Sequence, residues 1–203
     1  YPFAAVQQAQ RVAVIMPAFN PGPEIERAWK AIRGQDWVRA VPRLFIIDDA
    51  STDVAAVRRM ESLASEHLQH IQYIRLPKNA GPAAARNAGI AKALAMHVDW
   101  VAFCDHDDEW PAGKWTRQAG HALQHPALQI VGGLVKYHVA EGLEDPIDKY
   151  LDDDKHVSHV HLGALLARPA VFQQVGTFDE SMRFSEDFDW WNRVREANIP
   201  YQI

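Results

Sequence analysis

The sequence of 203 residues contains a single cysteine, Cys104. A lone cysteine excludes an internal disulfide and a zinc site made of several thiolates. No run of 18 apolar residues occurs, which predicts no membrane span. The opening residues lack the basic segment and long apolar stretch of a signal peptide. We therefore expect a cytoplasmic protein, with any attachment to the inner face of the membrane supplied by segments outside this sequence.

Positive charge is also scarce. There are 21 Lys and Arg against 26 Asp and Glu, which gives a net charge of −5, and no basic run occurs. This balance argues against nucleic acid as a partner. The acidic residues gather at 48–53, 105–109, 152–154 and 186–189. Aspartate is a poor helix former and a good ligand for hard cations, so these clusters predict either turns and helix caps or metal sites.

Short apolar runs alternate with helical patterns along the first part of the chain. We expect strands at 12–16, 44–48, 71–76 and 100–104, and helices at 24–33, 52–67, 83–97 and 112–125. Ser51 or Thr52 is the expected cap of the second helix. This order predicts an α/β fold, with a mostly parallel sheet and helices on both of its faces.

The second part of the chain is less regular. We expect a strand at 130–138, an apolar run at 162–167, and helices at 168–175 and 186–198. No linker divides the chain, so the sequence predicts one domain over residues 1–203. Residues 140–155 form a polar, acidic connection.

Polar residues follow three of the expected strands, at 17–20, 48–53 and 105–108. Ligands of open α/β sheets bind at the carboxyl ends of strands, so these segments predict one site. The site lacks the usual nucleotide loops, because neither GxGxxG nor GxxxxGK[ST] occurs. In the segment 105–108, carboxylates two residues apart can share Mg²⁺ or Mn²⁺, and a solvated turn is the alternative.

Three further patterns have a functional and a structural interpretation. A carboxylate in 48–53 can bind a base or a ribose, or it can form a turn and a helix cap. The helix start at 79–87 can face an anion with Arg86 one turn in, or Arg86 can simply lie on an exposed face. The acids and indoles of 186–191 can form a general base beside a sugar platform, or a helix start and core. The spacing of His156, His159 and His161 is not that of a known zinc site.

Five segments, taken in order, resemble the family 2 glycosyltransferases, which are inverting enzymes of the GT-A fold. They are VIMPAFN (14–20), FIIDDASTD (45–53), NAGPAAARNAGI (79–90), FCDHDD (103–108) and GTFDE…SEDFDWWNR (176–193). Each segment is short, but together they cover most of the chain in the family's order. Members of the family usually continue past the last segment, so the resemblance implies a domain truncated at its C-terminus. It also makes the segment 140–155 either a mobile acceptor loop or a solvated connection.

The resemblance implies a nucleotide-diphosphate-sugar donor and a glycan or lipid-linked glycan acceptor. The resemblance places Pro17, Asn20, Asp49 or Asp48, and Asp105 on the donor side. It makes Asp105 and Asp107 the DxD ligands of Mg²⁺ or Mn²⁺, and Asp187 the catalytic base. The residue patterns described above add Arg86 on the donor side and Glu186, Trp190 and Trp191 on the acceptor side.

The activity that this resemblance implies is metal-dependent, inverting sugar transfer in the synthesis of a polysaccharide. Two alternatives remain open. A nucleotidyltransferase shares the sheet and the acidic metal site, but it normally has a Gly-rich, basic first loop, which residues 17–23 lack. A non-catalytic module would bind a sugar nucleotide or a glycan without turnover.

Overall fold

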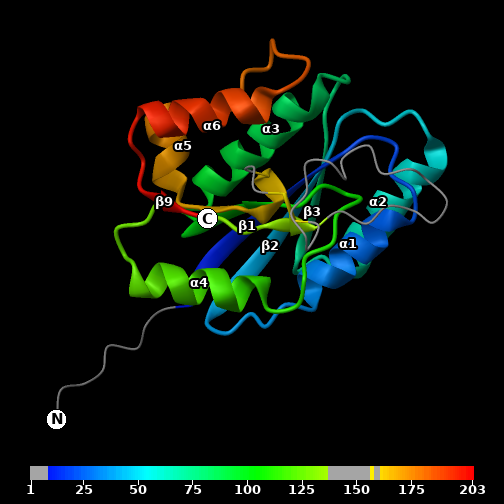
Figure 1. Ribbon diagram of the computed structural model, residues 1–203. Coiled ribbons are helices and arrows are strands. Elements are labelled where there is room, and N and C mark those ends of the chain that lie inside the picture. Colours follow the sequence, from blue (N-terminus) through cyan, green and yellow to red (C-terminus); the bar gives the residue numbers. More distant parts are fainter. Residues whose placement is uncertain (1–8, 137–155, 158–160) are drawn as a thin grey trace.

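The computed structural model describes residues 9–136, 156–157 and 161–203 (Figure 1). The segment 140–155 and His159 lie outside the described residues, as does the side chain of His156.

The elements that the sequence predicts occur in the predicted order, whereas the strand at 156–157 was not predicted. The described residues form 16 elements. They are β1 (Gln10–Ala18), α1 (Glu24–Arg33), β2 (Ala40–Asp48), α2 (Val54–Glu66), β3 (Ile71–Arg75), α3 (Gly81–Ala95), β4 (Trp100–Phe103), α4 (Lys114–Gln124), β5 (Ile130–Val131), β6 (Val135–Lys136), β7 (His156–Val157), the 3₁₀ turn η2 (Leu162–Ala164), β8 (Leu166–Ala167), α5 (Pro169–Val175), α6 (Glu186–Glu196) and β9 (Tyr201–Gln202).

Seven of the strands form one sheet in the order β3-β2-β1-β4-β8-β5-β9. The pairs β1–β2, β1–β4, β2–β3 and β5–β9 are parallel, and only β8 runs antiparallel to its neighbours β4 and β5. The small pair β6–β7 lies apart from this sheet. The α/β class and the mostly parallel sheet are therefore confirmed.

Helices cover both faces of the sheet, as predicted (Figure 1). Alternate residues of a strand point to opposite faces, so β1 contributes to two separate cores. Val12, Val14 and Met16 pack in one core with residues of α1, α2 and α4. Ala13 and Ile15 pack in the other with residues of α3, α5 and α6.

Helix α3 lies close against the centre of the sheet. A Cβ atom added at Gly89 would meet the side chain of Ile15 well inside contact distance. The small residues of α3 let its backbone approach β1, and this brings the start of the helix to the edge where β1 and β2 end. The position of α3 therefore matters for the site described below.

Four local predictions differ from the structure. Strand β1 continues through Pro17 to Ala18, where Pro17 lies in register with Ile47. The cap of α2 is Asp53, whose carboxylate accepts a hydrogen bond from Ala55 N at 2.8 Å, and not Ser51 or Thr52. The single strand expected from residue 130 onward is divided into β5 and β6, with two glycines between them. The apolar periodicity could not show this break. The run 162–167 begins as the 3₁₀ turn η2 and only then becomes a strand, β8.

Within the described residues, no helix is both long and apolar enough to cross a membrane.

Candidate active site

Three polar strand ends meet at one edge of the sheet, because β2, β1 and β4 are neighbours there. All three strands run parallel, so their carboxyl ends point the same way. The structure thus brings together the segments 17–20, 48–53 and 105–108, as the sequence predicts. The contacts of each side chain then decide what it can do.

Asp48 is a structural centre of this edge. Its side chain is fully buried, and it accepts hydrogen bonds from Ser51 N at 2.7 Å, from the Tyr73 hydroxyl at 2.6 Å and from Arg75 at 3.0 Å. Burial and the bond to Asp48 raise the pKa of Tyr73 to about 12. These contacts hold the end of β2 against β3, and no pattern in the sequence indicated that Tyr73 and Arg75 would supply them.

Asp49 joins the end of β2 to the start of α3. Its two carboxylate oxygens accept hydrogen bonds from the backbone N–H groups of Ala80 and Gly81, each at 2.8 Å. The first N–H groups of a helix have no partner within the helix, and an anion is favoured there by the helix dipole. The carboxylate of Asp49 therefore acts as a cap contributed by a distant segment.

The first loop is tied to the second by Asn20. This residue has a left-handed φ of 49°, and its side-chain oxygen accepts hydrogen bonds from Thr52 N at 2.8 Å and Asp53 N at 2.9 Å. Its own N–H donates to the Ser51 hydroxyl at 2.8 Å. Pro17 is buried in β1. Both residues lie at the expected edge, where they shape its loops.

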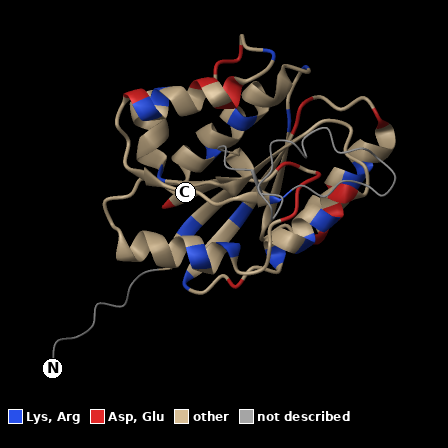
Figure 2. Ribbon diagram, viewed as in Figure 1, with Lys and Arg blue, Asp and Glu red and all other residues tan. Residues whose placement is uncertain are grey.

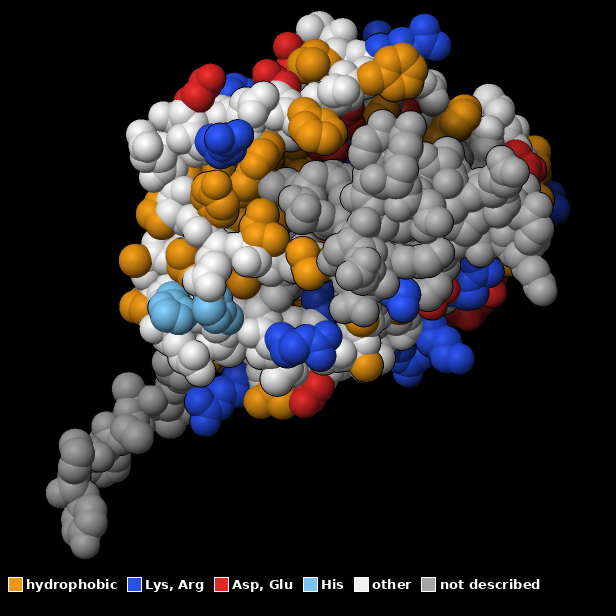
Figure 3. Space-filling view, in the orientation of Figure 1, with side chains coloured by type: hydrophobic (Ala, Val, Ile, Leu, Met, Phe, Trp, Pro, Cys, Tyr) orange, Lys and Arg blue, Asp and Glu red, His pale blue; other side chains and the backbone are white. Residues whose placement is uncertain are grey.

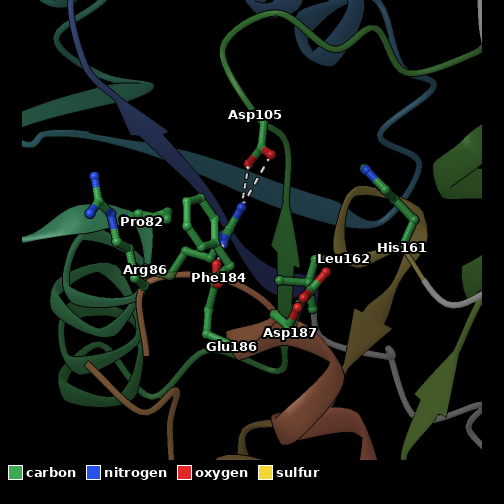
Figure 4. Close-up of a pocket in the computed structure, with 10 residues that line it drawn as sticks. Pro82, Arg86, Asp105, His161, Leu162, Phe184, Glu186 and Asp187 are labelled. Atoms are coloured by element: carbon green, nitrogen blue, oxygen red, sulfur yellow. Dashed lines mark hydrogen bonds and ion pairs between the residues drawn. The ribbon is translucent and has the colours of Figure 1, made fainter. Parts of the chain in front are cut away.

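A pocket of about 350 Å³ opens between the start of α3, the end of β4 and the start of α6 (Figure 4). Its lining comprises Pro82, Arg86, Asp105, His161, Leu162, Arg183, Phe184, Ser185, Glu186 and Asp187. The pocket therefore contains four of the residues that the sequence indicates for the site.

Arg86 lies in the wall of this pocket and pairs with carboxylates on both sides. One nitrogen donates to Glu186 Oε1 at 2.6 Å, and another lies 3.1 Å from each oxygen of Asp105 (Figure 4). The Arg86 side chain is only 9% exposed. Its charge is thus already paired within the protein.

The two acids at the start of α6 have different surroundings. Glu186 is buried and bound to Arg86, whereas Asp187 is half-buried and lines the pocket. The Asp187 carboxylate accepts one hydrogen bond, from Phe188 N at 2.9 Å. Acids gather in the first turn of α6 and bases in its last turn, which suits the helix dipole (Figure 2).

The loop after β4 presents several carboxylates in close succession. The Asp105 side chain is 32% exposed, and Asp107 is exposed. Burial, and then the charge of Asp105, raise the pKa of the neighbouring Asp108. The repulsion between these carboxylates is of the kind that a divalent cation relieves. Among the described residues, however, no group of three or more His, Cys, Asp or Glu is arranged to hold a metal ion.

Trp190 and Trp191 lie in the core and not in the pocket. The Trp190 indole is fully buried, stacks on Phe172 at 5.2 Å and donates to Gly176 O at 3.1 Å. Trp191 is 8% exposed and packs against Tyr201. This placement favours the second of the two interpretations that the sequence left open, in which both indoles belong to the core.

The aromatic side chain that does line the pocket is Phe184, which is 74% exposed. Hydrophobic side chains reach the surface around α6 (Figure 3). Sequence reasoning did not select Phe184, although it lies inside the fifth matched segment, between its two halves. His161 also lines the pocket, and its Nδ1 accepts a hydrogen bond from Gly163 N at 3.2 Å, so it caps η2.

The fold and the position of the pocket define an α/β domain of the GT-A type, with an acidic site at the carboxyl edge of its sheet. The chain belongs to the family described as Glycosyl transferase family 2, whose model matches residues 13–184.

Proteins of known sequence agree with this membership. The Pre-mycofactocin glycosyltransferase of Mycobacterium tuberculosis is 29% identical over 201 residues, which cover 92% of this chain and 39% of that protein. Glycosyltransferase AglE of Haloferax volcanii is 23% identical over 194 residues, which cover 92% of this chain and 62% of that protein. The chain therefore spans less than two thirds of the length of either relative.

Solved structures share the fold. The mannosyltransferase PcManGT from Pyrobaculum calidifontis, in complex with GDP-Man and Mn²⁺, matches with a TM-score of 0.68 and 21% identity, over 96% of this chain and 55% of that chain. TarS of S. aureus, in complex with UDP, matches with a TM-score of 0.66 and 19% identity, over 89% of this chain and 53% of that chain. At such identities the likeness concerns the fold alone.

Proposed function

We propose that this domain catalyses metal-dependent, inverting transfer of a sugar from a nucleotide-diphosphate-sugar to a hydroxyl group of a glycan or lipid-linked glycan. The observation that carries the proposal is the shared pocket of Asp105 and Asp187. One carboxylate comes from the end of a central strand and the other from the start of α6. This arrangement suits a donor held at the strand ends and an acceptor approaching from the side of α6.

The acidic loop fits a divalent cation. Mg²⁺ and Mn²⁺ prefer oxygen ligands, and Mg²⁺ in particular is bound by one or two carboxylates together with substrate phosphates and water. Asp105 and Asp107 are the carboxylates that would hold the ion, and the remaining ligands would come from the donor and from water. When bound, the ion supplies positive charge that stabilises the departing diphosphate.

Asp187 is the proposed catalytic base. It would take the proton of the acceptor hydroxyl as that oxygen forms a bond to the sugar C1 and the bond from C1 to the diphosphate oxygen breaks. A single displacement of this kind inverts the anomeric centre. Glu186 is a poorer candidate for the base because its carboxylate is buried and already bound to Arg86. Acid–base help of this sort contributes about 10²–10⁴-fold to the rate.

The edge formed by the first two loops would receive the nucleotide. Pro17, Asn20, Asp48 and Asp49 lie there, and their contacts give the edge a defined shape. In this proposal they act mainly by holding backbone groups in place, because most of their polar side-chain atoms already have protein partners.

The donor is tested by incubation of the protein with Mn²⁺ and a panel of UDP-, GDP- and dTDP-sugars. UDP-GlcNAc and GDP-Man are included because solved structures of the same fold contain them. Release of nucleoside diphosphate and free sugar, through slow hydrolysis, is the expected result. A control in EDTA separates this reaction from metal-independent breakdown.

Two further assays distinguish the alternative functions. Pyrophosphate formation from a nucleoside triphosphate and a sugar phosphate would indicate a nucleotidyltransferase. Binding of a donor in calorimetry without any turnover would indicate a non-catalytic module. Either result would contradict the proposed transfer.

A further inference from the structure

Arg86 connects two carboxylates of the protein, which a residue that only binds the donor would not do. It lies on α3, and its guanidinium connects Asp105 after β4 with Glu186 at the start of α6. Glu186 is 100 residues away in the sequence, and Asp105 is 19 residues away. Three elements of the pocket therefore meet at one buried cation.

The geometry of these contacts is directional. The distances to the two oxygens of Asp105 are equal, at 3.1 Å, and the bond to Glu186 is short, at 2.6 Å. Charge-assisted hydrogen bonds of arginine have a fixed fork geometry, which orients the carboxylates that accept them. The Nε of the guanidinium is also buried, and it has no hydrogen-bond partner among the described residues.

The start of α6 needs such an anchor. Ser185, the residue before the helix, has a left-handed φ of 64° and makes no side-chain cap. Glu186 is the first residue of the helix, and the proposed base Asp187 follows it directly. A shift of Glu186 would therefore move Asp187. No other ion pair is described for the first two residues of α6.

We propose that Arg86 is a positioning residue for sugar transfer, which fixes Asp187 on the acceptor side through Glu186 and orients Asp105 on the donor side. This inference rests on the proposed function. It replaces the sequence-based expectation that Arg86 binds the donor anion directly, because the guanidinium is already paired with two carboxylates of the protein.

Substitution of Arg86 leaves two carboxylates near one another without the intervening cation. R86Q keeps a polar side chain but removes the charge and the fork, whereas R86K keeps the charge but not the fork. E186Q removes the carboxylate that Arg86 holds. If Arg86 acts through Glu186, the double variant R86Q/E186Q should be little worse than R86Q alone, since residues in one network give non-additive effects.

A matched structural control lies on α6, the helix that Arg86 contacts through Glu186. Arg193 pairs with Asp189 at 2.8 Å and donates to Val175 O and Thr177 O, but it does not line the pocket. R193Q removes an arginine with several partners from α6, so it reports what the loss of a purely structural arginine does. We expect R193Q to lower the melting temperature and to leave kcat of the folded protein within about twofold of wild type, in line with a role limited to stability.

The experiment measures kcat and KM for donor hydrolysis with Mn²⁺, using whichever of UDP-GlcNAc and GDP-Man the wild type turns over. We expect R86Q to lower kcat by about 10²-fold, as a small misplacement of a catalytic group can do. R86K should fall between R86Q and wild type. A kcat of R86Q within twofold of wild type, or full additivity with E186Q, would overturn the proposal.

Hydrogen exchange of the backbone separates failure of this inference from failure of the proposed function. In R86Q the amides of residues 187–190 should exchange faster than in wild type, while those of α2 keep their rates; if R86Q does not fold, R86K replaces it. If the wild type turns over no donor, the proposed function fails, and faster exchange still supports the anchoring of α6 by Arg86. Unchanged exchange overturns that anchoring.

Discussion

The carboxylate of Asp49 accepts a hydrogen bond from the backbone N–H of Gly81 at 2.8 Å, across 32 residues of sequence. Its other oxygen accepts from Ala80 N, so one side chain at the end of β2 caps the start of α3. Because Arg86 lies one turn further along α3, this cap also determines where the guanidinium lies in the pocket.

We predict that D49A lowers the free energy of unfolding by about 1–2 kcal/mol, because two N–H groups at the partly buried start of α3 lose the buried carboxylate that caps them. The control is D53A, which removes the cap of α2 at its more exposed start and should cost about 1 kcal/mol. Urea denaturation followed by circular dichroism measures both. The assignment is contradicted if D49A is no more destabilising than D53A.

Replacement of the proposed base should affect turnover and not donor binding. We predict that D187N lowers kcat for transfer by about 10²–10⁴-fold, while the affinity for donor with Mn²⁺ stays within a few-fold. D179N serves as control, because Asp179 is an exposed acid that caps the turn to Ser181 outside the pocket. A normal rate for D187N would remove Asp187 from the mechanism.

Metal dependence should depend on Asp107. Activity should vanish in EDTA and return with added Mn²⁺. D107N should require about tenfold or more Mn²⁺ for half-maximal activity, because one of two proposed carboxylate ligands is lost. E109Q changes an exposed acid of the same loop that pairs with Arg27, and it should keep the wild-type requirement. Equal Mn²⁺ requirements for D107N and E109Q would contradict the ligand assignment.

Trp190 and Phe184 should behave in opposite ways. W190F loses the hydrogen bond to Gly176 O inside the core, so we predict a loss of about 1–3 kcal/mol in the free energy of unfolding. F184A removes a ring that is 74% exposed, so it should change the free energy of unfolding by less than about 0.5 kcal/mol. Because this ring lines the pocket, F184A should instead raise KM for the donor or for the acceptor. Thermal unfolding and steady-state kinetics on both variants test this contrast, which fails if F184A is the more destabilising of the two.

Lys114 should make stability depend on pH. Its ammonium lies 4.1 Å from the centre of the Trp110 ring and donates to Gln118 at 2.8 Å, and burial lowers the pKa of Lys114 to about 7. The unfolded chain holds this proton up to about pH 10.4, so between these values it binds more protons than the folded protein. The free energy of unfolding should therefore rise from pH 7 towards pH 10 on account of this group.

The variants K114M and K92M test this dependence by urea denaturation across that pH range. K114M should lack the contribution, whereas K92M, which changes an exposed lysine of α3, should retain the wild-type slope. The interpretation is wrong if the curve for K114M runs parallel to that of wild type.

Much of the fold was predictable because its signals are local. Apolar runs and helical spacing indicate each strand and helix of the parallel part. The rule that ligands lie at strand ends predicted that the segments 17–20, 48–53 and 105–108 form one site. Where the prediction of the cap of α2 failed, a contact between residues distant in the sequence determined the local structure. Asp53 and not Ser51 caps α2, because the Ser51 hydroxyl accepts a hydrogen bond from Asn20 N.

By itself the sequence determined the α/β class, the edge of the sheet at which the acids collect, and membership of a family through five ordered segments. Only the tertiary structure decided how the acids differ. Asp48 and Asp49 hold backbone and side-chain donors, Glu186 holds Arg86, and Asp187 faces the pocket. The physical reason is that the role of a carboxylate depends on the groups that bind it, and these groups come from segments as far as 100 residues away.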